Sequence, residues 1–204
     1  ALPGLELNSL IDYLFKFFLC SIRLSAFFIS SPFFGSRVIP LNVKIIFSLV
    51  ISFFYFGYLS DIQISEQILD NLVIVVIAEA LIGLSLGLTL TIWFAAASLA
   101  GEKIAATTGL GFSQMVDPDT GGQTPVISLI LDLFLITVFL SLNGHLIAIE
   151  FLFKSFEIFN INDGIPPFGL VGLGIEAASA MFYTGGLIML PVVGALLLTN
   201  IAIG

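Results

Sequence analysis

Charged residues are scarce in this chain: only 10% of its 204 residues are Asp, Glu, Lys or Arg, against about 25% in typical soluble domains. Hydrophobic residues make up 58%, and the mean hydropathy is +1.15. Such a chain lacks the polar groups needed to cover the surface of a soluble domain, so we expect a membrane protein. Only six residues are basic and the net charge is −8, which argues against a nucleic-acid partner, because phosphate binding needs clustered Lys and Arg.

Cysteine and histidine occur once each, as Cys20 and His145. One cysteine allows no disulfide within the chain, and one histidine excludes a metal site built from several His ligands. We therefore expect no metal and no cofactor, and we expect Cys20 to be a small buried side chain among apolar neighbours. Positive charge is also lacking near the N-terminus, where Glu6 and Asp12 stand, so no cleavable signal peptide is expected.

Long charge-free runs are the clearest feature that is present. A helix needs about 20 apolar residues to cross a bilayer, and runs of this length are too long for strands. They predict an all-α fold: one membrane-associated helical bundle over residues 1–204, with about five long, partly broken helices and a Gly-rich central loop. Pro191 lies inside the last run and predicts a kink there. The predicted helices are 9–30, 45–60, 80–101, 133–149 and 177–204, with a shorter apolar stretch at 165–175.

Small side chains recur at every fourth position along the third of these helices. Such positions wind slowly around a helix, and Gly83 and Gly87 form the G-x-x-x-G pattern through which membrane helices pack closely. Two interpretations are equally open: a contact between helices of this chain, or a contact surface for other subunits. The stripe consists of Glu79, Gly83, Gly87, Thr91 and Ala95.

A second polar stripe is predicted on a continuous helix over 126–152. Asp132 and Glu150 are about five turns apart and Asn143 falls about 20° from both, so the three share one face. Because charges at membrane depth tend to face protein or water, this face is expected to border a wet cavity or a partner. His145 points away from Asp132, which makes a catalytic Asp–His pair geometrically poor.

Residues 101–125 combine turn-forming and apolar residues between two apolar helices. Asp117-Pro118 favours a turn, whereas Phe112 and Met115 are unlike the side chains of a solvated loop. Irregular backbone at membrane depth must be buried in protein or line a cavity, so we predict a re-entrant or pore-lining loop in which Phe112 and Met115 close a constriction. A surface connector is the alternative. The candidate gate residues are Gly109, Leu110, Gly111, Phe112, Ser113, Met115, Asp117 and Pro118.

Two other function classes fit parts of the sequence. Ser113 follows Gly111 as in the turn that holds a serine nucleophile, with His145 as a possible base. Met115 stands where the second glycine of that motif belongs, so an intramembrane serine protease is the weaker alternative. Broken helices and buried carboxylates also suit a small-molecule transporter, although the inverted repeats of that class are not evident.

Residues spread over nearly the whole chain resemble the FliR family of flagellar type III export-gate proteins. The central motif is long, which makes it much more specific than a lone glycine pattern. It consists of Gly101-Glu102, Gly109 to Ser113 and Val116-Asp117-Pro118, with Gly121, Gln123 and Pro125. Further matches are Arg23, Pro32, Pro40, Lys44, Ile82-Gly83, Gly87, Phe139-Leu140, Asn143-Gly144-His145 and Ser155-Phe156.

The resemblance implies a non-enzymatic protein of the bacterial inner membrane, in the flagellar basal body. It implies FliP-like and FliQ-like membrane subunits and an FlhB-like export protein as partners, in a channel that exports unfolded flagellar proteins. The segment from Gly109 to Gly122 would contribute to the plug of the resting channel, with Phe112 as an apolar seal. FliR-like subunits sit partly raised from the bilayer, so that apolar helices need not all cross it. They also continue past Leu198-Thr199-Asn200 into a further helical hairpin, which this sequence does not contain.

Overall fold

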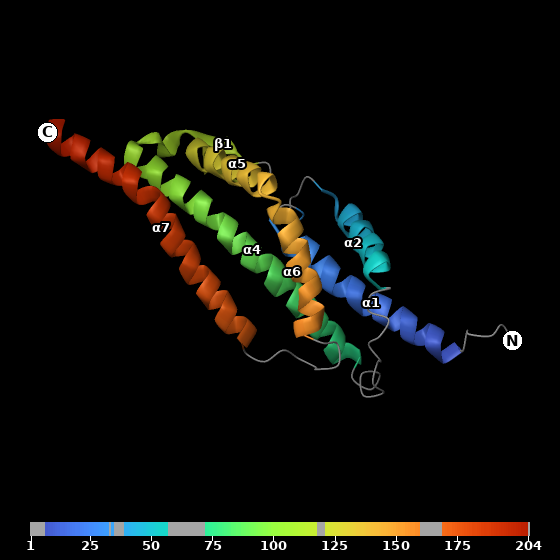
Figure 1. Cartoon of the computed structure of the whole chain (residues 1–204). Helices are drawn as coiled ribbons and strands as arrows, with labels where there is room; N and C mark the ends of the chain where they lie inside the picture. Colours follow the sequence, from blue (N-terminus) through green and yellow to red (C-terminus); the bar gives the residue numbers. More distant parts are fainter. Residues whose placement is uncertain are drawn as a thin grey trace. The chain divides into compact units, whose positions relative to one another are not determined.

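A computed structural model describes residues 7–32, 34, 39–56, 72–117, 121–159 and 169–203. Its α-helices are α1 (Leu7–Ser30), α2 (Leu41–Phe56), α4 (Leu72–Thr108), α5 (Val126–Ser141), α6 (Gly144–Ile158) and α7 (Gly169–Ile203) (Figure 1). Between α4 and α5 lie a 3-10 turn, η2 (Leu110–Phe112), and the strands β1 (Gln114–Val116) and β2 (Gln123–Pro125). The all-α prediction is confirmed, because the described residues hold six α-helices and one small hairpin.

The helices do not begin and end where the charge-free runs of the sequence begin and end. Helix α4 begins before Glu79 and continues past Glu102 and Lys103, because a charged side chain does not end a helix. Residues 101–108, predicted as part of a loop, are therefore the last two turns of α4. Helix α2 begins directly after Pro40, whose carbonyl oxygen accepts hydrogen bonds from the first turn. Helix α7 continues through Pro191.

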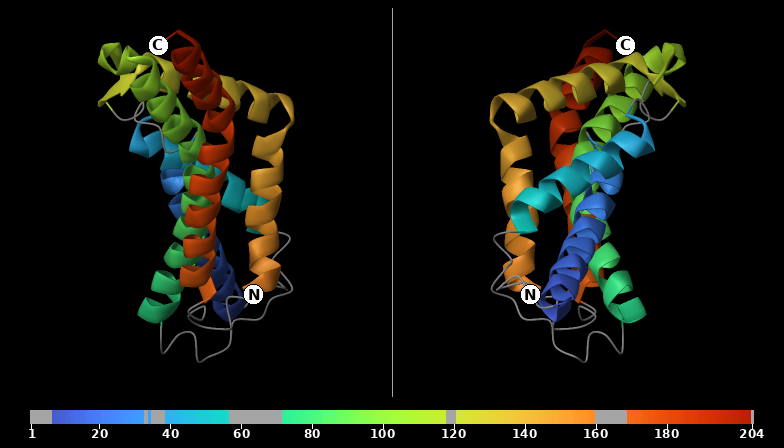
Figure 2. Two further views of the ribbon diagram at one scale, coloured as in Figure 1. Left: turned by 90° about the vertical axis from the view of Figure 1, so that its left-hand side faces the viewer. Right: turned by 90° about the vertical axis from the view of Figure 1, so that its right-hand side faces the viewer.

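The predicted helix at 133–149 is two helices that meet at a sharp corner (Figure 2). Asn143 adopts the left-handed conformation with φ 57°, and the axes of α5 and α6 differ by 70°. Asparagine tolerates this conformation better than most residues, since its short polar side chain can bond locally. The following Gly144 leaves no room for a Cβ, which would lie 2.5 Å from the Phe139 ring.

The chain divides into two compact units. The first unit contains α1, α2, α4 as far as Leu88 and α6 from Ile149. The second unit contains α4 from Thr89, the hairpin, α5, the first turn of α6, and α7 from Val171.

In the first unit, α2 packs against α1 with its serine side chains inward. Ser48 and Ser52 of α2 are fully buried, and the Ser48 hydroxyl lies 2.6 Å from that of Ser25 on α1. The exposed side of α2 is apolar, with Phe53 68% and Phe54 78% exposed. Apolar residues outward and polar residues inward reverse the pattern of a soluble bundle, as expected for a helix in hydrocarbon or against apolar protein.

In the second unit, α5 runs along the C-terminal half of α4. A Cβ at Gly101 would overlap the backbone of Ser128, so the two helices approach closely there. Farther along, the rings of Phe94 and Phe139 meet edge to face with centroids 5.2 Å apart. Helix α7 also approaches α4 closely, since a Cβ at Gly185 would lie 3.2 Å from a backbone carbonyl oxygen of α4.

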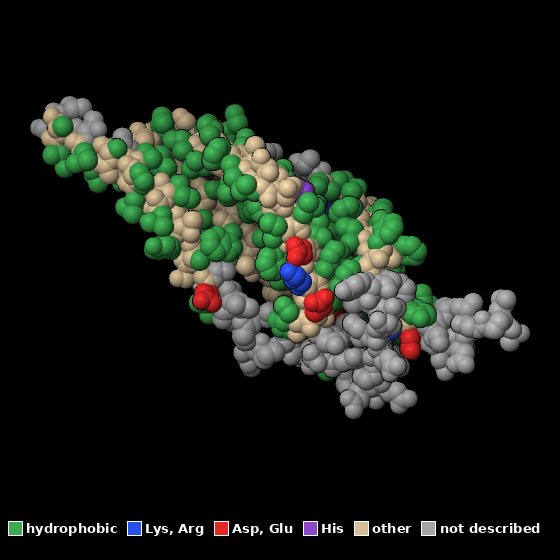
Figure 3. All heavy atoms as spheres, viewed as in Figure 1, with side chains coloured by type: hydrophobic (Ala, Val, Ile, Leu, Met, Phe, Trp, Pro, Cys, Tyr) green, Lys and Arg blue, Asp and Glu red, His purple; other side chains and the backbone are tan. Residues whose placement is uncertain are grey.

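Two or three of the described helical segments could cross a membrane by length and composition. Among the described residues, α1 over Ile11–Ser30 and α4 are long and apolar enough, and the bent α5–α6 pair adds a third if it counts as one span. Helix α2 has 16 residues and is about 24 Å long, short of the roughly 30 Å of a hydrocarbon core. On the face drawn in Figure 3, hydrophobic side chains predominate and charged ones are few.

Candidate functional site

The described candidate gate residues lie in a 3-10 turn and in the first strand of a short β-hairpin, which connects α4 to α5 in the second unit. Helix α4 ends at Thr108, and Gly109 follows with φ 77°, a conformation that costs glycine little because it has no Cβ. After η2, the strands pair antiparallel, with Gln114 opposite Pro125 and Val116 opposite Gln123. The predicted loop is therefore an ordered two-stranded ribbon.

Backbone hydrogen bonds close the ribbon at both ends. Near the turn, Asp117 N–H donates to the Gly122 carbonyl and Gly121 N–H donates to the Asp117 carbonyl, both at 2.8 Å. At the base, Val126 N–H donates to the Ser113 carbonyl at 3.0 Å, which fastens β1 to the start of α5. The predicted gate residue Pro118 lies outside the described residues.

The hairpin and the turn before it expose apolar side chains. Phe112 is 98% exposed, and Leu110, Met115 and Val116 are between 49% and 62% exposed. Gly111 and Asp117 are half-buried, and Ser113 is exposed. A cluster of exposed apolar side chains on a short ribbon is typical of a surface that is covered in the assembled state.

The serine-protease hypothesis finds no support in this geometry. Ser113 participates through its backbone, as donor to the Leu110 carbonyl and acceptor from Val126. The Nδ1 atom of His145 is buried and has no hydrogen-bond partner among the described residues, so it accepts no hydrogen bond from Ser113. In the same part of the chain, no group of three or more His, Cys, Asp or Glu side chains could hold a metal ion.

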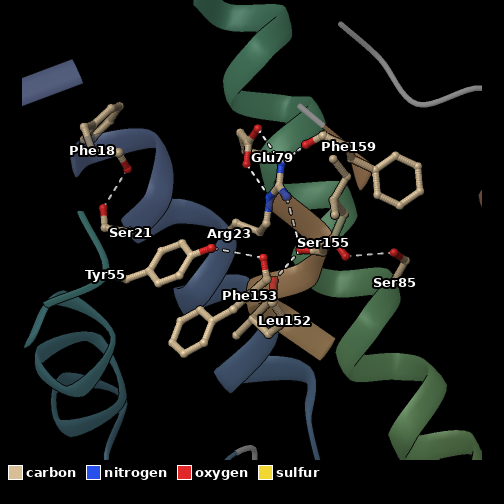
Figure 4. Close-up of polar contacts among 11 residues, drawn as sticks. Phe18, Ser21, Arg23, Tyr55, Glu79, Ser85, Leu152, Phe153, Ser155 and Phe159 are labelled. Atoms are coloured by element: carbon tan, nitrogen blue, oxygen red, sulfur yellow. Dashed lines mark hydrogen bonds and ion pairs between the residues drawn. The ribbon is translucent and has the colours of Figure 1, made fainter. Parts of the chain in front are cut away.

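The first unit contains a buried ion pair that joins α1 to α4 (Figure 4). Arg23 donates from Nε to Glu79 Oε2 at 2.6 Å and from Nη2 to Oε1 at 2.8 Å, a two-pronged contact. The side chains are 0% and 3% exposed. A buried charge is costly unless it is paired and hydrogen-bonded, and this two-pronged contact gives each side chain such a partner.

Two further hydrogen bonds from Arg23 reach α6 and the residue that follows it. Its Nη1 donates to the Ser155 hydroxyl at 3.1 Å and its Nη2 to the Phe159 carbonyl at 2.9 Å. The guanidinium carbon also lies 4.0 Å from the centre of the Phe156 ring, within the range of a cation–π contact. One side chain therefore joins three helices of the first unit.

Sequence reasoning did not find this pair. Glu79 was predicted only as the first member of the small-residue stripe, and Arg23 only as a motif residue. The available signal was that each charge stands in an apolar stretch, and opposite charges at membrane depth tend to pair.

The stripe glycines lie against α1 within this chain. A Cβ at Gly83 would overlap the Arg23 carbonyl oxygen, and a Cβ at Gly87 would overlap the Ser30 hydroxyl and lie 2.8 Å from the Phe27 carbonyl oxygen. The structure thus places this part of the stripe at a contact between helices of one chain. Thr91 is half-buried and belongs to the second unit.

The predicted face shared by Asp132, Asn143 and Glu150 does not exist, because the helix is broken at Asn143. The Ser98 hydroxyl of α4 lies 2.8 and 2.7 Å from the two carboxylate oxygens of Asp132. Glu150 is exposed and pairs with Lys154 one turn along α6 at 2.7 Å. Angular spacing relates residues only along an unbroken helix, and the bend of 70° ends that relation.

Comparison with known proteins points to bacterial protein export. Residues 14–204 match the family described as bacterial export proteins, family 1. The flagellar biosynthetic protein FliR of Bacillus subtilis is 31% identical over 201 residues, which cover 97% of this chain and 77% of that protein. FliR of Escherichia coli is 30% identical, covering 95% and 74%, and FliR of Aquifex aeolicus is 29% identical, covering 94% and 74%.

Proposed function

The chain belongs to the FliR family of bacterial export proteins, and from this premise we propose that it forms an export channel together with FliP-like and FliQ-like membrane subunits. Family membership makes the chain a membrane-embedded component of the flagellar export apparatus. The proposal adds the channel, through which unfolded flagellar proteins pass, and a plug formed by the hairpin. In this role the chain seals and assembles and performs no enzymatic chemistry.

The observation that carries the proposal is the exposure of Phe112 at the base of an ordered ribbon. Phe112 is 98% exposed, so covering its ring with another apolar surface would lower the free energy. Met115 and Val116 expose further apolar surface on the adjoining strand. The ribbon therefore brings several apolar side chains to one place with a backbone that is already ordered.

Apolar side chains close a narrow channel by excluding water. Ions cross such a constriction poorly, because they would have to leave their hydration shell. The proposed plug needs no charge and no metal, in keeping with the apolar character of Leu110, Phe112, Met115 and Val116. Passage of a protein would require the ribbon to move aside.

The proposed site of action is the bacterial inner membrane at the flagellar basal body. The exposed apolar side of α2 and the apolar helices α1 and α4 suit a surface shared between lipid and other membrane subunits. An FlhB-like export protein is a further proposed partner, taken from the family resemblance.

The plug is tested by Phe112→Ala and by deletion of residues 110–115, each produced in cells in place of the unaltered chain. Loss of the apolar seal should raise the permeability of the membrane to small ions while the complex still assembles. Membrane depolarisation and secreted flagellar proteins are measured side by side. Phe182→Ala is the matched control, since Phe182 is 62% exposed on α7, outside the hairpin.

A tight membrane in both altered strains, with export at the unaltered level, would show that the hairpin is no plug. Equal leakage from Phe182→Ala would show that leakage reports general damage to the complex. Phe112→Leu keeps an apolar side chain, so the membrane should remain impermeable to small ions.

A further inference from the structure

Two left-handed residues bracket the segment from Leu110 to Leu142. Gly109 precedes it with φ 77° and Asn143 follows it with φ 57°. In the described part of the chain the one other residue with positive φ is Gly121, inside the hairpin. Helix α4 ends at the first of these positions, and the chain turns by 70° at the second.

Between these two positions the hairpin and α5 are joined without a break. Strand β2 ends at Pro125 and α5 begins at the next residue. The Val126 N–H to Ser113 carbonyl bond ties β1 to the same point, and the strands are paired with each other. Moving the hairpin relative to α5 would break these bonds, whereas rotation at Gly109, which precedes all of them, breaks none of them.

Side-chain hydrogen bonds fasten α5 to α4 along this segment. The Ser98 hydroxyl lies 2.7 Å from a carboxylate oxygen of Asp132 on α5, and the Ser128 hydroxyl donates to the Ser98 carbonyl at 3.2 Å. Both contacts lie beside the close approach of Gly101 to Ser128. Hydrogen bonds to a charged group are stronger than neutral ones, especially away from water, so the Ser98–Asp132 contact is well suited to hold the two helices together.

We propose that α5 and the hairpin move as one body about Gly109 and Asn143, and that the Ser98–Asp132 contact is the latch that holds this body closed. This inference rests on the proposed function of the hairpin as a plug and adds how the plug moves. Opening breaks the latch, separates α5 from α4 at Gly101 and at the Phe94 ring, and displaces Phe112 together with α5, while the strands stay paired. The hairpin itself neither melts nor swings alone.

The latch is tested with Ser98→Cys combined with Asp132→Cys in the otherwise unaltered chain. Cys20 stays, because it is fully buried in α1. Without a cross-linker this variant lacks the latch, and it should leak ions and populate the open state about tenfold more than the unaltered chain, as for the loss of one hydrogen bond to a charged group. A short thiol-specific bifunctional reagent should seal it and stop export.

A cross-link within one helix is the matched control. Ser179→Cys with Tyr183→Cys places two thiols one turn apart on exposed positions of α7, and the reagent should change neither leakage nor export there. The two single cysteine variants should respond to the reagent no differently from this control. A reagent that is cleaved by reduction should restore export when the reductant is added.

Normal export by the cross-linked Ser98–Asp132 variant would overturn the proposal, since the hairpin would then open without α5. If the double-cysteine variant leaks ions no more than the unaltered chain before cross-linking, the Ser98–Asp132 contact is not a latch. Failure of the plug itself gives a different result: deletion of residues 110–115 would leave the membrane tight. The two failures are therefore distinguishable.

Discussion

The buried Arg23–Glu79 pair makes the sharpest prediction for stability. Arg23→Met leaves the Glu79 carboxylate 3% exposed with its charge partner gone, and Glu79→Gln leaves the guanidinium without a counter-charge. Removing one partner of a buried pair costs about 3–5 kcal/mol, because the remaining charge stays desolvated. For a chain of this size each kcal/mol lowers the melting temperature by roughly 2–4 °C, so each variant should melt roughly 6–20 °C lower.

The paired change Arg23→Met with Glu79→Gln, which combines the two single changes, measures how far the two side chains depend on each other. This change removes both charges, so neither is left alone in an apolar environment. It should cost at least about 2 kcal/mol less than the sum of the two single changes, the interaction energy expected of residues in direct contact. The loss that remains reports the Ser155 and Phe159 bonds that Arg23 also makes.

Thermal unfolding of the purified protein in detergent, followed by circular dichroism, measures these changes. The matched control is Glu150→Gln, which breaks an ion pair whose side chains are 55% and 62% exposed and should leave the melting temperature unchanged. Additive single changes, or single changes no larger than that of the control, would refute the reasoning. In either case Arg23 and Glu79 would not depend on each other.

Three further predictions concern backbone positions. Gly87→Ala should destabilise the protein by about 1–3 kcal/mol, because its Cβ would meet the Phe27 carbonyl oxygen. Gly186→Ala, with open space around it, should be neutral or stabilising. The melting temperature measures both changes. Gly109→Ala should cost about 1–2 kcal/mol because φ is 77°, while Gly111→Ala should not; comparable losses would contradict the hinge geometry. Asn143 has φ 57°, so Asn143→Gly should be tolerated and Asn143→Val should lower stability. The reverse order of stability would exclude a left-handed residue at this position.

Several properties were predictable from local sequence. The scarcity of charge and the long apolar runs predict a helical membrane protein, because the cost of placing charge in hydrocarbon acts residue by residue. The turn at Asp117 and Gly121 is predicted by residue types that favour turns, and hydrogen bonds close it as expected. The FliR resemblance rests on the same local motifs and is confirmed by the comparisons.

Other features required the tertiary structure. Arg23 and Glu79 are 56 positions apart, and their pairing depends on the close approach of α1 to α4 at Gly83. The break at Asn143 separates Asp132 from Glu150, although helical spacing predicted a common face.

Composition and turn chemistry thus determined the class of protein, its helical character and the turn between α4 and α5, because each depends on neighbouring residues alone. Only the tertiary structure decided which charges meet, which side of α2 turns outward, and that the hairpin is fastened to α5. Those outcomes depend on contacts between residues far apart in sequence, where the position of one helix sets the surroundings of another.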